Sequence, residues 1–155
     1  MNPVLQEHAT PSDQGHPRRL HQAITALAEQ DVNVFVFADE GRLLDASPAY
    51  AEQPVEQIAA ICSGLVTGAH RCARLGRPAR TNEASSVVIR YTSASVVLLP
   101  ITDQIWAGCM SGPDQVIRTA HALALFAEQA APLVPKTVGW SLPAMTATGI
   151  GGGSR

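Results

Sequence analysis

The spacing of apolar residues changes type several times along the central part of the chain. Residues 18–30 (RRLHQAITALAEQ) carry apolar side chains at helical spacing and predict an amphipathic helix. Residues 32–38 (VNVFVFA) are β-branched and aromatic and predict a strand. A second apolar run follows at 42–47, after the turn residues Asp39-Glu40-Gly41, so the two strands are expected to form a hairpin.

In the second half of the chain the spacing of apolar residues again switches between helical and strand patterns. A long helix is predicted over residues 54–76, with proline at its first position and another proline shortly after its end. Three short strands follow at 85–91, 95–101 and 104–110, and their connections are too short for anything but antiparallel hairpins. Residues 111–114 (SGPD) are expected to cap a last helix, whose predicted apolar stripe is Val116, Ile117, Ala120, Leu123, Ala124, Ala127 and Ala130.

This order of elements, α-β-β-α-β-β-β-α, predicts an α+β fold in which helices pack on an antiparallel sheet. We expect one domain over residues 17–134, between an unstructured arm at 1–16 and a flexible tail at 135–155. Both ends are rich in Gly, Pro, Ser and Thr and show no periodicity. Within the tail, Trp140 and Leu142 are the side chains that could dock on the domain.

Small residues recur along one side of the helix predicted at 54–76. Ala60, Gly64 and Gly68 follow one another at intervals of four and therefore form one ridge. Each interior glycine costs a helix about 1 kcal/mol relative to alanine, so some close contact is expected to offset that cost. The side expected to face the sheet consists of Ile58, Cys62, Leu65, Ala69 and Cys72.

A second copy of the chain is the simplest cover for this ridge. Small residues let two helix backbones approach closely, and homo-oligomers are usually twofold and self-complementary. We therefore predict that two copies pair antiparallel through this helix, with Ala60, Gly64, Thr67 and Gly68 near the contact. The alternative interpretation is an alanine-rich helix that happens to contain two neutral glycines.

Composition narrows the class of protein. A chain of 155 residues with 46% apolar and 15% charged residues fits one globular domain. With a net charge of −2, the chain lacks the excess of positive charge that binds the phosphates of nucleic acid. Residues 1–16 lack the apolar core of a secretory signal, and the longest apolar stretch, around 58–69, is too short to span a membrane. Three cysteines without CxxC spacing indicate free thiols in a cytoplasmic protein.

The motifs of common catalytic sites are absent from the sequence. The five histidines are scattered without zinc-site spacing, GLVTGAH lacks the lysine of a phosphate-binding loop, and no Gly-x-Ser-x-Gly occurs. Asp39, Glu40 and Asp45 cluster at the first hairpin, where turn chemistry explains them. We therefore expect no catalytic site, metal site or cofactor.

Four arginines follow one another around the end of the middle helix. They are Arg71, Arg74, Arg77 and Arg80. Cations are favourable at a helix C-terminus, and such runs are usually solvated. The alternative is a site that binds an acidic partner.

Several segments together resemble the roadblock/dynein light-chain family, and more narrowly its bacterial branch found beside Ras-like small GTPases. The segments are VNVFVFADEGRLLDAS, the small-residue helix with AAICSGL, VVIRYTSASVVLLPITDQIWAGC and the closing helix. The resemblance covers about residues 17–134. The long Gly/Pro-rich tail and the arginine-rich loop depart from the family pattern.

The resemblance implies a five-stranded antiparallel sheet with helices on both faces. It also implies dimers joined through the middle helix and the strand after it, here with Val87 and Ile89. Bacterial members of the family act on a partner GTPase as activators or scaffolds, and actinobacterial ones are encoded with a sensor-kinase-like protein. The leading hypothesis is therefore a non-enzymatic, homodimeric regulator or scaffold of a Ras-like small GTPase. The alternative is a small-molecule sensor of the PAS or GAF kind.

Overall fold

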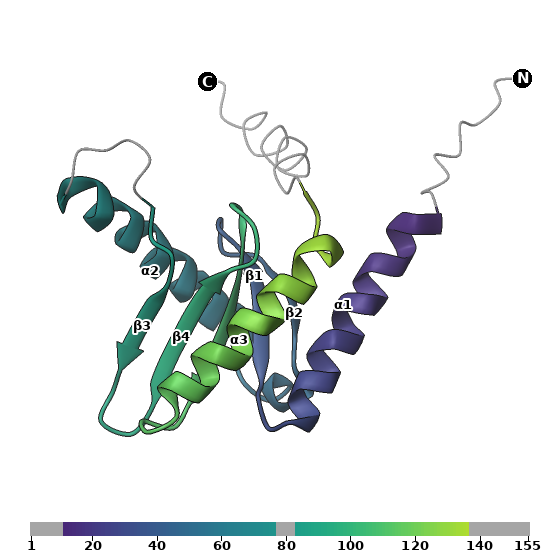
Figure 1. Ribbon diagram of the computed structural model, residues 1–155, viewed down its shortest axis with the longest axis horizontal. Coiled ribbons are helices and arrows are strands. Elements are labelled where there is room, and N and C mark those ends of the chain that lie inside the picture. Colours follow the sequence, from purple (N-terminus) through teal and green to yellow (C-terminus); the bar gives the residue numbers. More distant parts are fainter. Residues whose placement is uncertain (1–10, 77–82, 137–155) are drawn as a thin grey trace, which may run out of the picture.

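The computed structural model describes residues 11–76 and 83–136 of the chain. An antiparallel sheet runs through the middle of the molecule, between the helices (Figure 1). It has five strands in the order β2-β1-β5-β4-β3. Helices α1 (Pro11–Glu29) and α3 (Val116–Ala130) pack on one face, and helix α2 (Val55–Gly76) packs on the other. The predicted fold class, element order and placement of helices on both faces are confirmed.

The strands form a continuous antiparallel ladder. They are β1 (Val34–Ala38), β2 (Leu43–Ala46), β3 (Val87–Arg90), β4 (Ser95–Pro100) and β5 (Ile105–Ser111). The short helices η1 (Pro48–Tyr50) and η2 (Ala131–Leu133) follow β2 and α3. Strand β5 lies between β1 and β4, so the last strand of the sequence joins the two halves of the sheet. Strands β2 and β3 are its edges.

Helix α1 begins earlier than the apolar pattern predicts. Its first residue is Pro11, so the last six residues of the segment 1–16, expected to be unstructured, are helical. A first-turn proline is tolerated because its missing N–H would have no helical partner. Apolar spacing marks only the part of the helix that contacts the sheet, where Leu20 and Ile24 are buried. Residues 1–10 lie outside the described chain.

The predicted cap of α3 is wrong. Gln115 precedes the helix and its side chain makes no capping hydrogen bond. Ser111, expected in the cap, instead ends β5 opposite Ser95. The two hydroxyls lie 2.9 Å apart, and Ser95 is fully buried. This polar pair extends the sheet by one residue beyond the apolar run that predicted the strand.

The buried side of α3 is rotated from the predicted stripe. Its buried residues are Thr119, Leu123, Phe126, Ala127 and Ala130. Ile117 is 88% exposed and Ala124 is also exposed. Residues three and four apart share a helix face. The buried face passes through Thr119, Leu123 and Phe126, so Ile117 and Ala124 lie beside this face and are exposed.

Each face of the sheet has its own core. The core under α1 and α3 is built around Ile24, Val34, Val36, Val97, Ile105 and Leu123. The core under α2 is built around Phe35, Phe37, Val66, Leu98 and Trp106. Every residue of β1 is buried, because successive side chains of this strand enter opposite cores.

A glycine at the centre of the sheet makes room for an aromatic ring. Gly108 of β5 pairs with Phe35 on one side and Leu98 on the other. A Cβ at position 108 would lie 2.3 Å from Phe35 Cζ and 2.9 Å from Leu98 Cδ2. The Phe35 ring stacks on Phe37 and meets the Tyr50 ring edge-on, so it has little freedom to move away.

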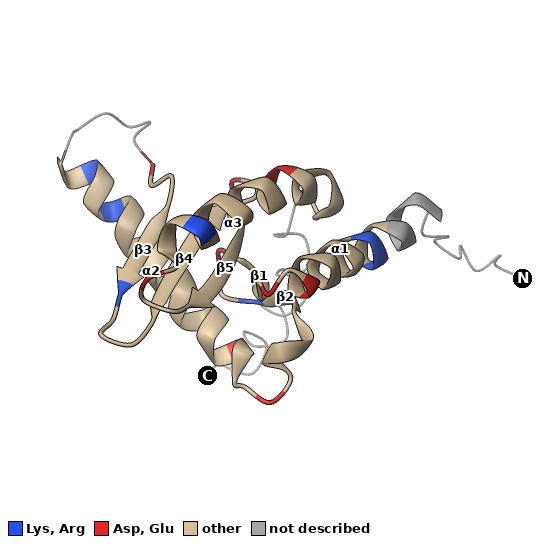
Figure 2. Ribbon diagram, turned by 60° about the horizontal axis from the view of Figure 1, so that its bottom comes forward, with Lys and Arg blue, Asp and Glu red and all other residues tan. Residues whose placement is uncertain are grey.

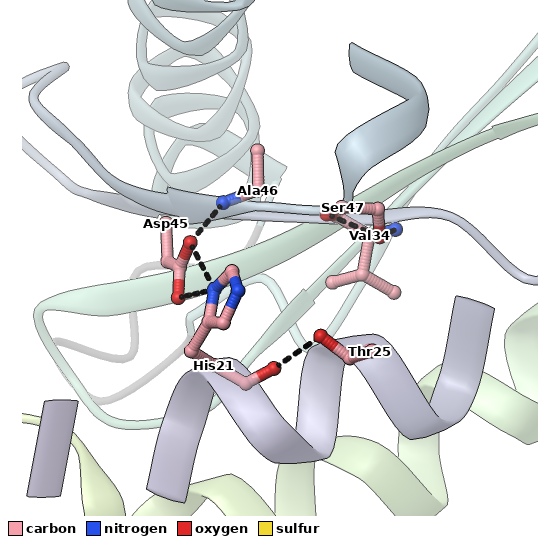
Figure 3. A network of polar contacts seen from close by, with 6 residues as sticks. All are labelled: His21, Thr25, Val34, Asp45, Ala46 and Ser47. Carbon is pink, nitrogen blue, oxygen red and sulfur yellow. Dashed lines mark hydrogen bonds and ion pairs between the residues drawn. The ribbon is translucent and has the colours of Figure 1, made fainter. Parts of the chain in front are cut away.

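One edge of the sheet is tied to helix α1 by polar contacts (Figure 3). His21 Nδ1 lies 3.1 Å from Asp45 Oδ2 of β2, and Asp45 Oδ1 accepts a hydrogen bond from the Ala46 amide at 2.8 Å. Just beyond β2, Ser47 Oγ accepts a hydrogen bond from the Val34 amide at 2.8 Å. The edge at β2 is therefore flanked by a helix and held by side chains.

The packing around Gly108 predicts that Gly108→Ala destabilises the fold. Overpacking of this kind typically costs about 1–3 kcal/mol, and urea unfolding followed by circular dichroism measures it. The control is Gly112→Ala, whose Cβ would meet only Gln115 Cδ, at 4.0 Å. We expect the control to unfold like the unmodified chain. Equal stability of the two variants would contradict the packing of Phe35 on Gly108.

Candidate functional site

Helix α2 has one buried side and one open side. Its buried residues are Ala59, Cys62, Ser63 and Val66, and Ile58 and Leu65 are half-buried beside them. The predicted sheet-facing side was correct at Ile58, Cys62 and Leu65. It was wrong at Cys72, which is exposed, whereas Ala69 is only half-buried.

The hairpin turn between β1 and β2 packs on the first half of this buried side. Gly41 in the turn has φ = 101°, a conformation that favours glycine. A Cβ at position 41 would lie 3.4 Å from Ala60 Cα and 3.6 Å from Ser63 Cβ, so the turn closely approaches α2. Ser63 Oγ also donates a hydrogen bond to the Asp39 carbonyl. Gly41 is thus the small residue that this approach favours, while Ala60 is exposed beside the turn and Ser63 is buried against it.

The open side of α2 follows a coiled-coil spacing. Six of its exposed residues follow one another in steps of four and three, and we call them the outer stripe: Gln57, Ile61, Gly64, Gly68, Arg71 and Leu75. Ile61 is 65% exposed and Leu75 is 86% exposed. Steps of four and three are typical of helices that pair with another helix.

The two central glycines of the outer stripe have no partner among the described residues. A Cβ built at Gly64 or Gly68 would meet nothing within 4 Å. Thr67 is exposed beside them, and its hydroxyl donates to the Ser63 carbonyl of the same helix at 3.1 Å. Glycine weakens a helix by about 1 kcal/mol relative to alanine. The described chain offers no contact that offsets this cost at Gly64 or Gly68.

The sheet edge at β3 lies on the side of the molecule away from α1 (Figure 1). Val87 and Ile89 are half-buried and face the α2 side, because Val87 packs in the core under that helix. Val88 is 45% exposed and Tyr91, just after the strand, is 56% exposed. Within residues 11–76 and 83–136, no helix or strand pairs along this edge. Open edges of this kind are available for pairing with another chain.

Two of the four candidate arginines lie on the last turns of α2. Arg71 and Arg74 are exposed, and basic residues are coloured along this end of the helix in Figure 2. Neither forms an ion pair with a carboxylate in the described part of the chain. Arg77 and Arg80 lie outside the described residues. The structure therefore brings two of these cations to the same end of α2.

A cavity of about 410 Å³ lies beside this end of α2. Trp106 forms part of its wall, and the His70 ring meets the Trp106 ring edge-on with centroids 5.8 Å apart. His70 Nδ1 accepts a hydrogen bond from the Ala84 amide at 3.0 Å. Three carboxylates, those of Asp39, Glu83 and Asp103, also line the cavity. The sequence did not single out this cavity, since its residues come from five separate segments.

Clusters of three or more metal-ligating side chains and helices able to span a membrane are both absent from the described residues. No three His, Cys, Asp or Glu side chains within 11–76 and 83–136 are close enough together to hold a metal ion. No helix in this part of the chain combines the length and apolarity that crossing a membrane requires. Among the acidic residues of the first hairpin, Asp45 contacts His21 at 3.1 Å and Glu40 contacts Arg42 at 3.4 Å.

Comparison with solved structures identifies the fold. Sequence comparison matches no family model and no curated protein. MglB from Myxococcus xanthus superposes with a TM-score of 0.66 at 13% identity, over 78% of this chain and 94% of that one. MglB, a gliding protein of Thermus thermophilus, gives 0.63 at 10% identity, over 76% and 90% of the two chains.

A third structure carries the family name itself. It is a Roadblock/LC7 domain from Streptomyces avermitilis, with a TM-score of 0.60 at 15% identity, over 70% of this chain and 92% of that one. At identities of this size, the superpositions establish the arrangement of the helices and strands alone. The chain therefore has the roadblock/LC7 fold that its sequence pattern resembles.

Proposed function

We propose that the chain is a homodimeric regulator or scaffold of a Ras-like small GTPase in a bacterial signalling system, with no catalytic activity of its own. The outer stripe of α2 is the observation that carries the proposal, because its glycines find no use within the described chain. The roadblock/LC7 fold supports it, since the sequence resembles the branch of that family found beside small GTPases. A sensor-kinase-like protein is a further partner that the resemblance suggests.

The position of the glycines favours an antiparallel pair of helices. The midpoint of α2 (Val55–Gly76) lies between Leu65 and Val66, and Gly64 and Gly68 lie on either side of it. A twofold axis near this midpoint lets the two helices overlap along their whole length and places their closest approach at the glycines. Self-complementary twofold contacts are the commonest kind in homo-oligomers.

The charges of α2 favour the same orientation. Glu56 lies in the first turn and Arg74 in the last, and Arg71 lies one turn earlier. An antiparallel pair sets the acidic start of each helix against the basic end of the other, whereas a parallel pair would set like charges together. Charge complementarity of this kind selects one orientation over the other.

The β3 edge extends this proposed surface. Val87 and Ile89 lie on the α2 side of the edge strand, so a second copy paired along α2 reaches them as well. The proposed contact therefore combines Ala60, Gly64, Thr67 and Gly68 with this edge. Ala60 contributes least, because its Cα already lies against the turn at Gly41.

A dimer of this kind offers a GTPase a surface built from two copies. A regulator acts on a switch protein only through its different affinities for the two states. The switch loops of a GTPase are ordered by the γ-phosphate and magnesium, so its GTP-bound and GDP-bound surfaces differ. We propose that Arg71 and Arg74, with Arg77 and Arg80 beyond the described residues, contact the acidic surface of this partner.

A small-molecule sensor is the second candidate, and the cavity beside Trp106 favours it. Ligand sites are typically concave with a few polar groups, and His70, Arg74 and Asp39 line this cavity. A native mass spectrum of the purified chain separates the two candidates. A dimer without added mass supports the regulator, and a bound small molecule supports the sensor.

The first test of the dimer is Gly64→Leu. The added side chain points into open space in one copy, so the fold should be retained, but it should separate two paired helices. We expect sedimentation velocity to show a dimer for the unmodified chain and a monomer for the variant. Ala26→Leu, at an exposed position of α1, is the matched control and should remain dimeric. A dimeric Gly64→Leu variant would place the contact on another surface.

The second test uses the native cysteines. Burial raises the pKa of Cys62 and of Cys109 to about 11, so both remain protonated and unreactive below pH 9. Cys72 is exposed on α2, one turn after Gly68. A thiol reagent in excess should therefore label one cysteine per chain, Cys72. The labelling rate should fall at higher protein concentration, where more of the chain is dimeric. A labelling rate that does not change across the range of dimerisation would contradict a contact near Cys72.

The third test concerns the partner. We expect a Ras-like GTPase to co-purify with the chain from its native host and to bind it with different affinity when loaded with GTP or GDP. Arg74→Gln, which removes the charge without placing a carboxylate against Glu56 of the other copy, should weaken this binding, whereas the control Arg118→Gln, exposed on α3, should not. Calorimetric titration measures the affinity of each variant for the GTPase in each nucleotide state. Equal affinity for the two nucleotide states would leave only a scaffold, and absence of binding to any GTPase would refute the proposed partner.

A further inference from the structure

An apolar groove lies on the face of the sheet opposite α2. Helix α3 runs along β4 there (Figure 1). A hollow of about 360 Å³ lies between them. Leu99 and Pro100 of β4 form one wall, and the small side chains of Ala124, Ala127 and Ala131 form the other. The alanines create the hollow, because larger side chains on α3 would fill it. The groove is separate from the outer stripe of α2, which lies on the opposite face.

The chain itself leaves the domain beside this groove. Ala131, which lines the groove, begins η2, and Val134 just after η2 is 4% exposed and packs in the core under α1 and α3. The exit point of the chain is thus held in place at this end of α3. The described chain ends at Lys136, five residues after Ala131.

The segment that follows carries one large aromatic residue close to the exit. Residues 137–155 are rich in Gly, Ser and Thr, and Trp140 is their only aromatic residue. It lies four residues after Lys136, a span of up to about 14 Å of extended chain. A tethered side chain has a high effective concentration at a nearby site, so even a modest apolar contact suffices to hold it.

We propose that Trp140 occupies the groove between α3 and β4 of its own chain. Burial of a tryptophan removes about 150–250 Å² from water, and Leu99, Ala124 and Ala127 provide an apolar surface for it. A buried indole N–H also needs an acceptor. Glu128 and Ser85 line the same groove and supply oxygen atoms for it. The Trp140 ring would thereby cover the apolar surface that α3 leaves open.

The test uses fluorine NMR of the full chain labelled with 5-fluorotryptophan. The sequence holds two tryptophans, Trp106 and Trp140, so two resonances are expected, and Trp140→Phe assigns them. Trp106 is 2% exposed and serves as an internal standard for a buried ring. We expect Trp140 to be protected from a soluble paramagnetic agent, as Trp106 is. A Trp140 signal broadened as strongly as that of free 5-fluorotryptophan would overturn the proposal.

Blocking the groove provides the second arm of the test. Ala124→Arg introduces a long side chain at an exposed position of the groove, so Trp140 should lose its protection while Trp106 keeps its own. Ala26→Arg, exposed on α1, is the control and should change neither signal. Protection of Trp140 that survives Ala124→Arg would place the ring elsewhere. Protection that disappears on dilution to the monomer would assign the groove to the tail of a second copy.

Discussion

The packing of α2 on the sheet is the constraint on which the rest of the structure depends. The buried stripe of the helix lies over the rings of Phe35, Phe37 and Trp106, and it includes the small residues Ala59 and Ser63. A helix that lies flat on a sheet can bury only one of its faces there. Once that face is set, Ile61, Gly64 and the rest of the outer stripe must point away from the domain.

The same constraint distinguishes the glycines of the chain from one another. Gly108 is required by its own fold, because the Phe35 ring occupies the space where a side chain would be. Gly41 is required by a tight turn that approaches α2. Gly64 and Gly68 meet nothing in the described chain. A contact between chains gives these two residues a physical role that the domain alone does not.

Much of this architecture could be predicted from the sequence, because the apolar pattern switches cleanly between helical and strand spacing. The pattern located α2 to within one residue and predicted the antiparallel hairpins that join β1 to β2, β3 to β4 and β4 to β5, although not the pairing of β1 with β5. It failed where a distant segment decides the outcome. The buried side of α2, which leaves Cys72 exposed, includes Ser63, and the backbone that Ser63 contacts belongs to the separate turn at Asp39 and Gly41. The polar first turns of α1 carry no apolar signal, and the cavity at Trp106 assembles only in three dimensions.

The central claim is that the outer stripe of α2 contacts a second copy of the chain. Isotope-filtered NMR on a mixture of ¹³C-labelled and unlabelled chains tests it most directly, because it detects only contacts between copies. The account predicts intermolecular NOEs from the methyl groups of Thr67 and Ile61 to protons of α2 in the other copy. A dimer whose intermolecular NOEs involve only other surfaces, or a chain that remains monomeric at NMR concentrations, would contradict it.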